Sequence, residues 1–108
     1  MKMTYRNEIL NVTTEALAGA TTDKALAWNG NDDRLILVVE NSGSTDGSIT
    51  IKAGDGIQGV NDLTLTAKAG INLVKLDSGR FKNVTGTNKG KIVVRGAASI
   101  KVAVVELA

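Results

Sequence analysis

Two clusters of oxygen-bearing side chains are the features of this chain that come closest to a chemical site. One comprises Asp55, Asn61 and Asp62 in the sequence DGIQGVND. A second acidic turn lies earlier in the chain and comprises Asn29, Asn31, Asp32 and Asp33. Calcium ions favour such oxygens, but neither cluster has the regular ligand spacing of a calcium-binding loop. Because Gly, Asn and Asp also favour reversals of the backbone, we interpret both clusters as turns and predict no metal site.

Histidine and cysteine are both absent from the 108 residues. Without cysteine there is no thiol nucleophile, no disulfide framework and no thiolate zinc site. Without histidine the chain lacks the usual proton shuttle and the commonest metal ligand. These two absences exclude most familiar hydrolase and metalloenzyme constellations. We therefore predict a protein that is not an enzyme, with no catalytic residues and no cofactor.

Aromatic residues are equally scarce, since Tyr5, Trp28 and Phe81 are the whole set. Surfaces that stack sugars or unpaired bases need several exposed rings, so glycan binding and single-strand binding are both disfavoured. No stretch approaches the ~18 apolar residues of a membrane span, and we expect no membrane partner. The first ten residues lack the apolar core of a secretory signal, so synthesis and assembly in the cytoplasm are expected.

Charge is distributed unevenly along the chain. Residues 1–56 carry a net charge of −3 and residues 57–108 a net charge of +5, within an overall +2. Five basic residues fall in neighbouring predicted loops and strands: Arg80, Lys82, Lys89, Lys91 and Arg95. We expect this cluster to dock on an acidic protein surface, although for any single residue a solvated side chain that discourages aggregation is the stronger interpretation. No groove-reading helix is evident, so no nucleic-acid partner is expected.

The elements that position these residues are predicted to be short strands, because the dominant hydrophobic period is two. Arg34–Glu40 is an almost continuous apolar run, which indicates a central strand covered on both faces. Ser48–Ala53 and Leu63–Lys68 alternate cleanly, which predicts two strands with one solvent-exposed face each, joined by a glycine-rich loop. Further strands are expected at residues 8–13, 72–76, 80–84, 91–95 and 100–108.

Pairs of turn-forming residues separate these runs at short intervals. Seven or eight short strands with such spacing predict an all-β fold, a single-domain antiparallel β-sandwich of the immunoglobulin-like or jelly-roll-like type. We assign residues 14–108 to the sandwich and residues 1–13 to an N-terminal arm that contains the first strand. Residues 14–28 are expected to be irregular, with a strand near Trp28.

The last predicted strand has two apolar faces. Ile100, Val102 and Val104 point to one side, and Ala103, Val105 and Leu107 to the other. The second set forms either another core surface, which we favour, or a contact between subunits. If the chain forms oligomers, these three residues are our candidates for the contact.

Several segments resemble a known family. The run VVENSGSTDGSITIKAGDGIQGVNDLTLTAKAG, the segment SGRFKN and the terminal KVAVVEL are similar to small structural proteins of tailed bacteriophages, the capsid decoration or auxiliary head proteins. The similarity covers about residues 34–107. Its matching points are Asn41 at a strand end, the IKAG turn with Ile51 and Gly54, and SGRFKN. None of them is a catalytic signature.

The resemblance implies a protein that binds the outer surface of a phage capsid and stabilises it. The implied partner is the major capsid protein, the implied location is the virion exterior, and a homotrimer is the favoured oligomer. Tyr5, Arg6 and Ile9 are then candidate docking residues of the N-terminal arm, beside the basic cluster. Two alternatives remain: an adhesion module that binds a host glycan or protein, and another head or tail morphogenesis subunit.

Overall fold

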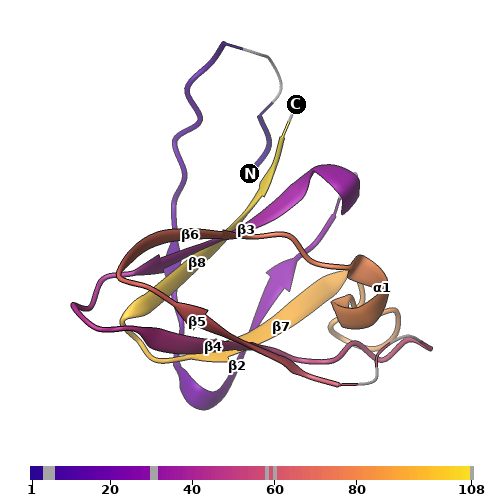
Figure 1. Ribbon diagram of the computed structural model, residues 1–108. Coiled ribbons are helices and arrows are strands. Elements are labelled where there is room, and N and C mark those ends of the chain that lie inside the picture. Colours follow the sequence, from indigo (N-terminus) through magenta and orange to yellow (C-terminus); the bar gives the residue numbers. More distant parts are fainter. Residues whose placement is uncertain (4–6, 30–31, 58, 60, 108) are drawn as a thin grey trace.

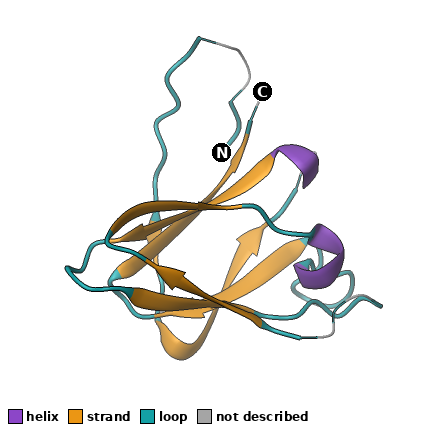
Figure 2. Ribbon diagram, viewed as in Figure 1, coloured by secondary structure: helices purple, strands orange, loops and turns teal. Residues whose placement is uncertain are grey.

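The computed structural model describes residues 1–3, 7–29, 32–57, 59 and 61–107. In these residues, eight strands form two four-stranded antiparallel sheets that pack face to face (Figures 1 and 2). The β8 sheet has the order β1 (Glu15–Ala16), β8 (Ile100–Glu106), β3 (Leu35–Asn41) and β6 (Gly70–Val74). The β7 sheet has the order β2 (Gly19–Ala27), β7 (Lys91–Gly96), β4 (Gly47–Ile51) and β5 (Leu63–Ala67). Two single turns of helix are η1 (Asp32–Arg34) and α1 (Ser78–Phe81).

The strands of the first half of the chain pair with those of the second half in reverse order. β1 pairs with β8, β2 with β7, β3 with β6 and β4 with β5. Two further pairings, β3 with β8 and β4 with β7, complete the sheets. Eight strands wound in this way into two packed sheets make a jelly roll. The predicted all-β sandwich is confirmed, and the strand order selects the jelly roll over the immunoglobulin type.

The core lies between the sheets and is filled by alternate residues of the strands. On β3, Leu35, Leu37 and Val39 are at most 2% exposed, while the residues between them are only half-buried. Burial of each such aliphatic side chain contributes roughly 1.5–3 kcal/mol to stability. The chain has no disulfide, so this layer is the main source of its stability. The members of the core are Leu17, Leu26, Trp28, Leu35, Leu37, Val39, Ile49, Ile51, Ala67, Phe81, Ile92, Val94, Ile100 and Val102.

The predicted pair of strands around the DGIQGVND loop is confirmed. β4 and β5 form an antiparallel hairpin in which Ile49 lies opposite Leu65 and Ile51 opposite Leu63. Ile49 and Ile51 face the core, and the threonines between the apolar residues face outward. This is the one pair of consecutive strands that are hydrogen-bonded neighbours in the described part of the chain.

Residues 14–28 are more regular than predicted: the strand expected near Trp28 is present, but it begins at Gly19 and is the longest strand among the described residues. β2 spans nine residues, and its register against β7 shifts between Gly19 and Lys24. Most of its side chains are exposed. The irregularity and the exposure together remove the clean alternation from which a strand could be predicted.

Two predicted strands are wrong. Residues 8–13 form no strand, and the first strand is the two-residue β1 that follows them. Residues 80–84 were expected to be extended, but Ser78–Phe81 form the helical turn α1. Asp77 caps this turn, since its carboxylate accepts a hydrogen bond from the Gly79 amide at 3.1 Å and its carbonyl accepts one from the Arg80 amide at 3.1 Å. A side chain that satisfies the first amides of a helix outweighs a weak strand pattern.

The outer face of β3 also differs from the prediction. Ile36, Val38 and Glu40 point away from the core and are half-buried, so β3 is fully covered on one face only. Their neighbours on β6, Ile71 and Leu73, are largely exposed. The outer face of the β8 sheet therefore carries apolar side chains that no second layer covers completely.

Asn41, at the end of β3, is the one buried polar side chain among the described residues. Its amide nitrogen donates hydrogen bonds to the carbonyls of Thr45 at 2.9 Å and Ala67 at 3.0 Å, and its side-chain oxygen accepts one from the Gly43 amide at 3.0 Å. Ala67 ends β5, so the side chain links the two sheets.

We expect Asn41→Ala to lower the free energy of unfolding by about 3 kcal/mol, because it removes three hydrogen bonds and leaves the buried Ala67 carbonyl without its donor. Urea unfolding measures the change, and Asn61→Ala at an exposed position is the control. A loss below about 1 kcal/mol for Asn41→Ala would contradict the linking role.

Gly54 is required by close packing of two backbone segments. Its amide donates a hydrogen bond to the Arg80 carbonyl at 2.8 Å, and a Cβ atom at this position would lie 2.6 Å from the Lys82 carbonyl oxygen. The sequence suggested that Gly54 reverses the chain, but its φ is not in the left-handed region. The contact instead holds the β4–β5 loop against α1.

Gly54→Ala should therefore destabilise the fold by about 2 kcal/mol, since backbone atoms cannot rotate aside as a side chain can. The matched control is Gly56→Ala, where an added Cβ would meet only Val84 side-chain atoms at 3.8 Å or more. Thermal and urea unfolding of both variants test this. Equal effects at the two positions would show that the close approach is not what selects glycine.

Candidate docking surfaces

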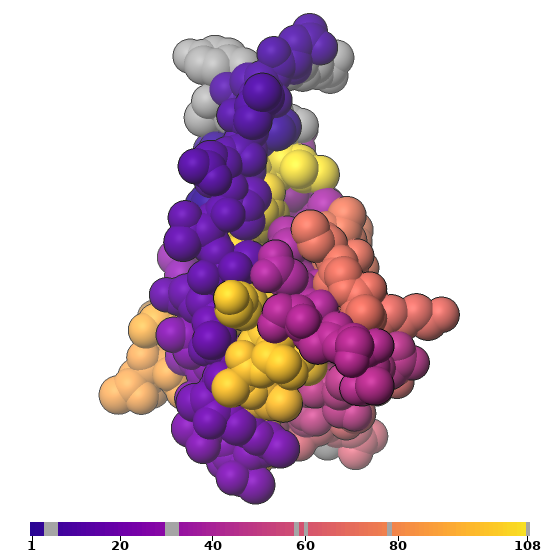
Figure 3. Space-filling model, turned by 90° about the vertical axis from the view of Figure 1, so that its left-hand side faces the viewer, coloured from indigo at the N-terminus to yellow at the C-terminus, as the bar shows by residue number. Residues whose placement is uncertain are grey.

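The N-terminal segment is held at both of its ends by the same edge of β8. The Met3 amide donates to the Glu106 carbonyl at 2.8 Å, and the Glu106 amide donates to the Met1 carbonyl at 2.7 Å. At the other end of the segment, β1 pairs with β8 so that Glu15 lies opposite Val102. Between these anchors the described residues 7–13 project beyond the body of the sandwich, and we call them the N-terminal loop (Figures 1 and 3).

Further contacts reinforce the first anchor. The amino group of Met1 donates to the Val104 carbonyl at 2.8 Å, and the side chains of Lys2 and Glu106 form an ion pair at 3.7 Å. The Thr13 amide approaches the Met1 sulfur at 3.4 Å, which brings the returning part of the loop back to its start. The loop is thus closed at its base by the chain's own contacts.

An apolar groove lies where this loop meets the outer face of the β8 sheet. It has a volume of about 310 Å³. The N-terminal segment contributes three of its eight lining residues, and strands β3, β6 and β8 with the residue after β8 contribute the other five. The lining residues are Met3, Leu10, Val12, Ile36, Val38, Leu73, Val105 and Leu107. All eight are apolar, so the groove suits an apolar side chain rather than a polar ligand.

The three candidate oligomer residues on β8 are placed differently by the structure. Ala103 is 6% exposed and Val105 5% exposed, whereas Leu107 is 40% exposed. They point to the outside of the sheet, and Val105 lies in the groove with Met3, Leu10 and Val12. The N-terminal loop of the same chain thus borders this face, and Leu107 is the member that remains accessible.

Of the three candidate docking residues of the arm, the structure describes only Ile9. Tyr5 and Arg6 lie outside the described residues. Ile9 lies in the projecting loop and is 98% exposed, which is unusual for so large an apolar side chain. It presents an apolar contact directly to solvent beside the groove residue Leu10.

Four of the five candidate basic residues lie in two adjacent segments. Arg80 and Lys82 lie in and just after α1, and Lys89 and Lys91 lie at the turn before and the start of β7. Two backbone hydrogen bonds join these segments, from the Asn83 amide to the Lys91 carbonyl at 2.9 Å and from the Gly90 amide to the Asn83 carbonyl at 2.8 Å, and the Asn83 side chain donates a third to the Lys91 carbonyl at 3.1 Å. Arg80 also stacks over the Phe81 ring at 4.9 Å.

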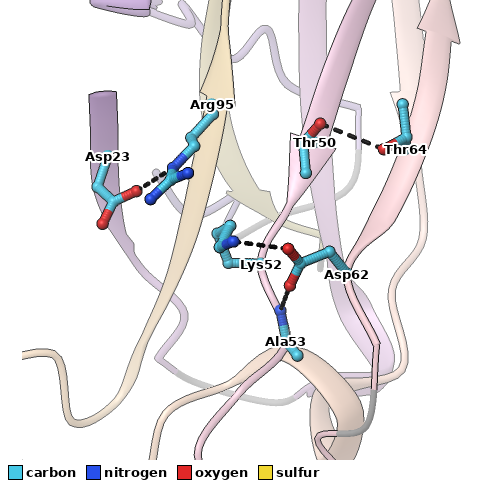
Figure 4. A network of polar contacts seen from close by, with 7 residues as sticks. All are labelled: Asp23, Thr50, Lys52, Ala53, Asp62, Thr64 and Arg95. Atoms are coloured by element: carbon cyan, nitrogen blue, oxygen red, sulfur yellow. Dashed lines mark hydrogen bonds and ion pairs between the residues drawn. The ribbon is translucent and has the colours of Figure 1, made fainter. Parts of the chain in front are cut away.

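Arg95 is separate from this group, because it forms an ion pair with Asp23 of β2 (Figure 4). Asp23 raises the pKa of Arg95 through this hydrogen bond. The pairing neutralises a residue that the sequence suggested as a docking cation. The sequence could not reveal it, since Asp23 and Arg95 are 72 residues apart and lie in strands whose pairing is non-local.

The carboxylates in the loop of the β4–β5 hairpin accept hydrogen bonds from other groups of the same chain. Asp62 accepts hydrogen bonds from the Lys52 ammonium at 2.6 Å and the Ala53 amide at 2.7 Å (Figure 4), and these hold its pKa below the ordinary value. Asp55 accepts hydrogen bonds from the Thr85 hydroxyl at 2.6 Å and the Val84 amide at 2.7 Å, which lower its pKa likewise. Within the described residues no group of three or more acidic side chains is placed to hold a metal ion.

The aromatic residues offer no stacking platform in the described part of the chain. Trp28 is fully buried and Phe81 is 2% exposed, so both belong to the core. Tyr5 lies outside the described residues. A glycan or base would therefore find neither Trp28 nor Phe81 at the surface.

Comparison with known proteins gives no identification. No family model, no curated protein and no solved structure matches the chain. In the part of the chain that the structure describes, no helix has the length and apolar character needed to cross a membrane.

The carboxylate of Asp55 should make the fold sensitive to acid. Its pKa in the folded protein is lower than the value of about 3.9 expected in the unfolded chain. A depressed pKa contributes stability that is complete above the unfolded value and is lost as the pH falls through the folded value. We expect the free energy of unfolding to fall as the pH drops from about 5 to 2.

Asp55→Asn should reduce this dependence, and Thr85→Val should reduce it in the same sense by removing the main hydrogen-bond donor. Urea unfolding across the pH range measures both slopes. Wild-type acid sensitivity in Asp55→Asn would contradict the assignment.

Proposed function

We propose that this chain is a structural virion protein that binds the outer surface of a phage capsid and stabilises it without catalysis. The observation that carries the proposal is the projecting N-terminal loop, closed at its base on β8 and bearing the exposed Ile9. The choice of a capsid as the partner rests on the resemblance of residues 34–107 to decoration proteins. The partner is then the major capsid protein, and the location is the exterior of the virion.

The geometry suits a clamp. A loop anchored at both ends loses less conformational freedom on binding than a free tail does, so more of the contact energy remains as affinity. The body behind it is a jelly roll of two packed sheets, which resists deformation because its interior is filled by interlocking aliphatic side chains. Several copies bound to neighbouring capsid subunits would gain further from multivalency.

The adjacent basic residues form a second proposed contact. Arg80, Lys82, Lys89 and Lys91 extend from the segments around α1 and the start of β7, and an acidic capsid surface would complement them. Figure 1 places α1 at the side of the sandwich and the N-terminal loop above it. The two contacts would then engage different parts of the capsid surface. An adhesion module for glycans is less well supported, because Trp28 and Phe81 are buried.

Co-sedimentation with expanded capsids of the encoding phage tests the proposal. We expect Ile9→Asp to reduce capsid binding by at least about tenfold, because it places a charge at an apolar contact. Ile57→Asp is the matched control, since Ile57 is equally exposed but lies in the β4–β5 loop. Deletion of residues 1–13 is a poorer test, because it also removes the pairing of Met1 and Met3 with β8.

Absence of capsid binding by the unaltered chain would reject the role. Binding that Ile9→Asp and Ile57→Asp leave equally strong would reject the loop as the docking arm.

A further inference from the structure

The outer edge of β6 is open for pairing. In the part of the chain that the structure describes, β6 is the last strand of its sheet and pairs only with β3. Its sequence, GINLV, contains no charged residue. On its outer face Ile71 is 70% exposed and Leu73 is 66% exposed. An edge with free main-chain groups and exposed apolar side chains is a template for another strand.

The other sheet edges carry features that discourage such pairing. β2 has the exposed polar run Thr21, Thr22, Asp23 and an irregular register against β7. β5 presents Thr64 and Thr66 outward and lies between charged residues at its two ends. β1 has only two residues, and Met1–Met3 covers the rest of that side of β8. Charges and bulges are among the usual protections of an edge, and β6 contains neither, although Lys75 follows it directly.

We propose that β6 is the site at which two copies of this chain join, by antiparallel pairing of β6 with β6 about a two-fold axis at Asn72. In this register Ile71 of each copy lies opposite Leu73 of the other, and Gly70 lies opposite Val74. All five residues of the strand are paired. The largest exposed apolar side chains of the sheet thereby become cross-strand pairs, which stabilise antiparallel sheets.

The charged residues beside β6 are compatible with this pairing. Continued beyond the strand, the register sets Lys75 opposite Ala69 and Lys68 opposite Leu76, so that no two like charges face each other. The polar side chain at the centre, Asn72, is already satisfied within its own chain. Its amide group donates to the Lys68 carbonyl at 2.9 Å and accepts from the Lys68 amide at 3.3 Å.

The joined sheets acquire the composition of an interface. Side chains that are opposite in the register share a face of the sheet, so the two outer faces point to the same side. Val38 and Leu73 of one copy then lie in a row with Ile71 of the other. Glu40 and Lys101 of that other copy close one end of the row, and Ala103 of the first copy lies at its opposite end. An apolar centre with a charged rim is typical of protein interfaces.

This pairing goes beyond the capsid role and does not depend on it. It also places both apolar grooves, and with them both N-terminal loops, on one side of the dimer. The contact is isologous and closes with two copies, which distinguishes it from the trimer that the family resemblance implies.

Sedimentation velocity and light scattering across a wide range of concentrations test the proposal on the full chain. We expect a species of twice the 11.2 kDa chain mass. Leu73→Glu should weaken dimerisation at least about 30-fold, because each dimer contains two charges opposite Ile71. The control Ile57→Glu, at a still more exposed apolar position away from β6, should dimerise like the unaltered chain.

The register has its own test in the double variant Ile71→Lys with Leu73→Glu. Each lysine then lies opposite a glutamate of the second copy, so dimerisation should recover relative to Leu73→Glu alone. Hydrogen exchange on the unaltered chain adds a readout that needs no substitution: amide protection within residues 70–74 should rise with protein concentration.

A chain that stays monomeric, or that forms a trimer, overturns the proposal. So does a dimer that Leu73→Glu leaves intact, or one whose residues 70–74 gain no protection. Failure of the double variant to recover overturns the register at Asn72. Capsid binding is not measured in any of these experiments, so their failure is distinct from failure of the proposed function.

Discussion

The pairing of β3 with β8 is the interaction on which the rest of the structure depends. Seven consecutive residue pairs join these strands, from Leu35 opposite Glu106 to Asn41 opposite Ile100. Their inner faces supply five of the fourteen core residues, namely Leu35, Leu37, Val39, Ile100 and Val102, and each strand offers its second edge to another element. The free edge of β8 receives β1 and Met1–Met3, and the free edge of β3 receives β6. The N-terminal loop and the β6 edge are therefore both built outward from this single ladder.

The sequence predicted the strands whose two faces differ in character. β4 and β5 alternate between core and solvent, so both the strands and their connection could be read from the residues. Of β2 only the end near Trp28 was predicted, because most of its side chains are exposed and its register shifts, which leaves no period to detect over the rest of the strand. The helical turn α1 was missed because the apolar Phe81 suggested a strand, while the capping role of Asp77 depends on geometry that a pattern does not display.

For the candidate sites too, features within one strand could be predicted, whereas contacts between distant segments could not. The apolar outer face of β8 was recognised from Ala103, Val105 and Leu107. That Met3, Leu10 and Val12 of the same chain border it could not be recognised, because Met3 and Glu106 meet across almost the full length of the sequence. Arg95 was likewise grouped with four other basic residues, although Asp23 neutralises it from a strand far away in the chain. Contacts between distant segments leave no periodic trace in the sequence.

The reverse order of the pairing has a consequence for the time at which the fold can form. β3 leaves the ribosome well before β6 and β8, and about 60 residues separate Asn41 from its partner Ile100. At about 5–20 residues per second, that interval leaves the nascent strand without its principal partner for several seconds. The β4–β5 hairpin is the one pairing of consecutive strands that can form meanwhile in the described part of the chain. Protection of the growing chain from aggregation therefore rests on Leu35–Asn41 remaining soluble or shielded until the final strand has been synthesised.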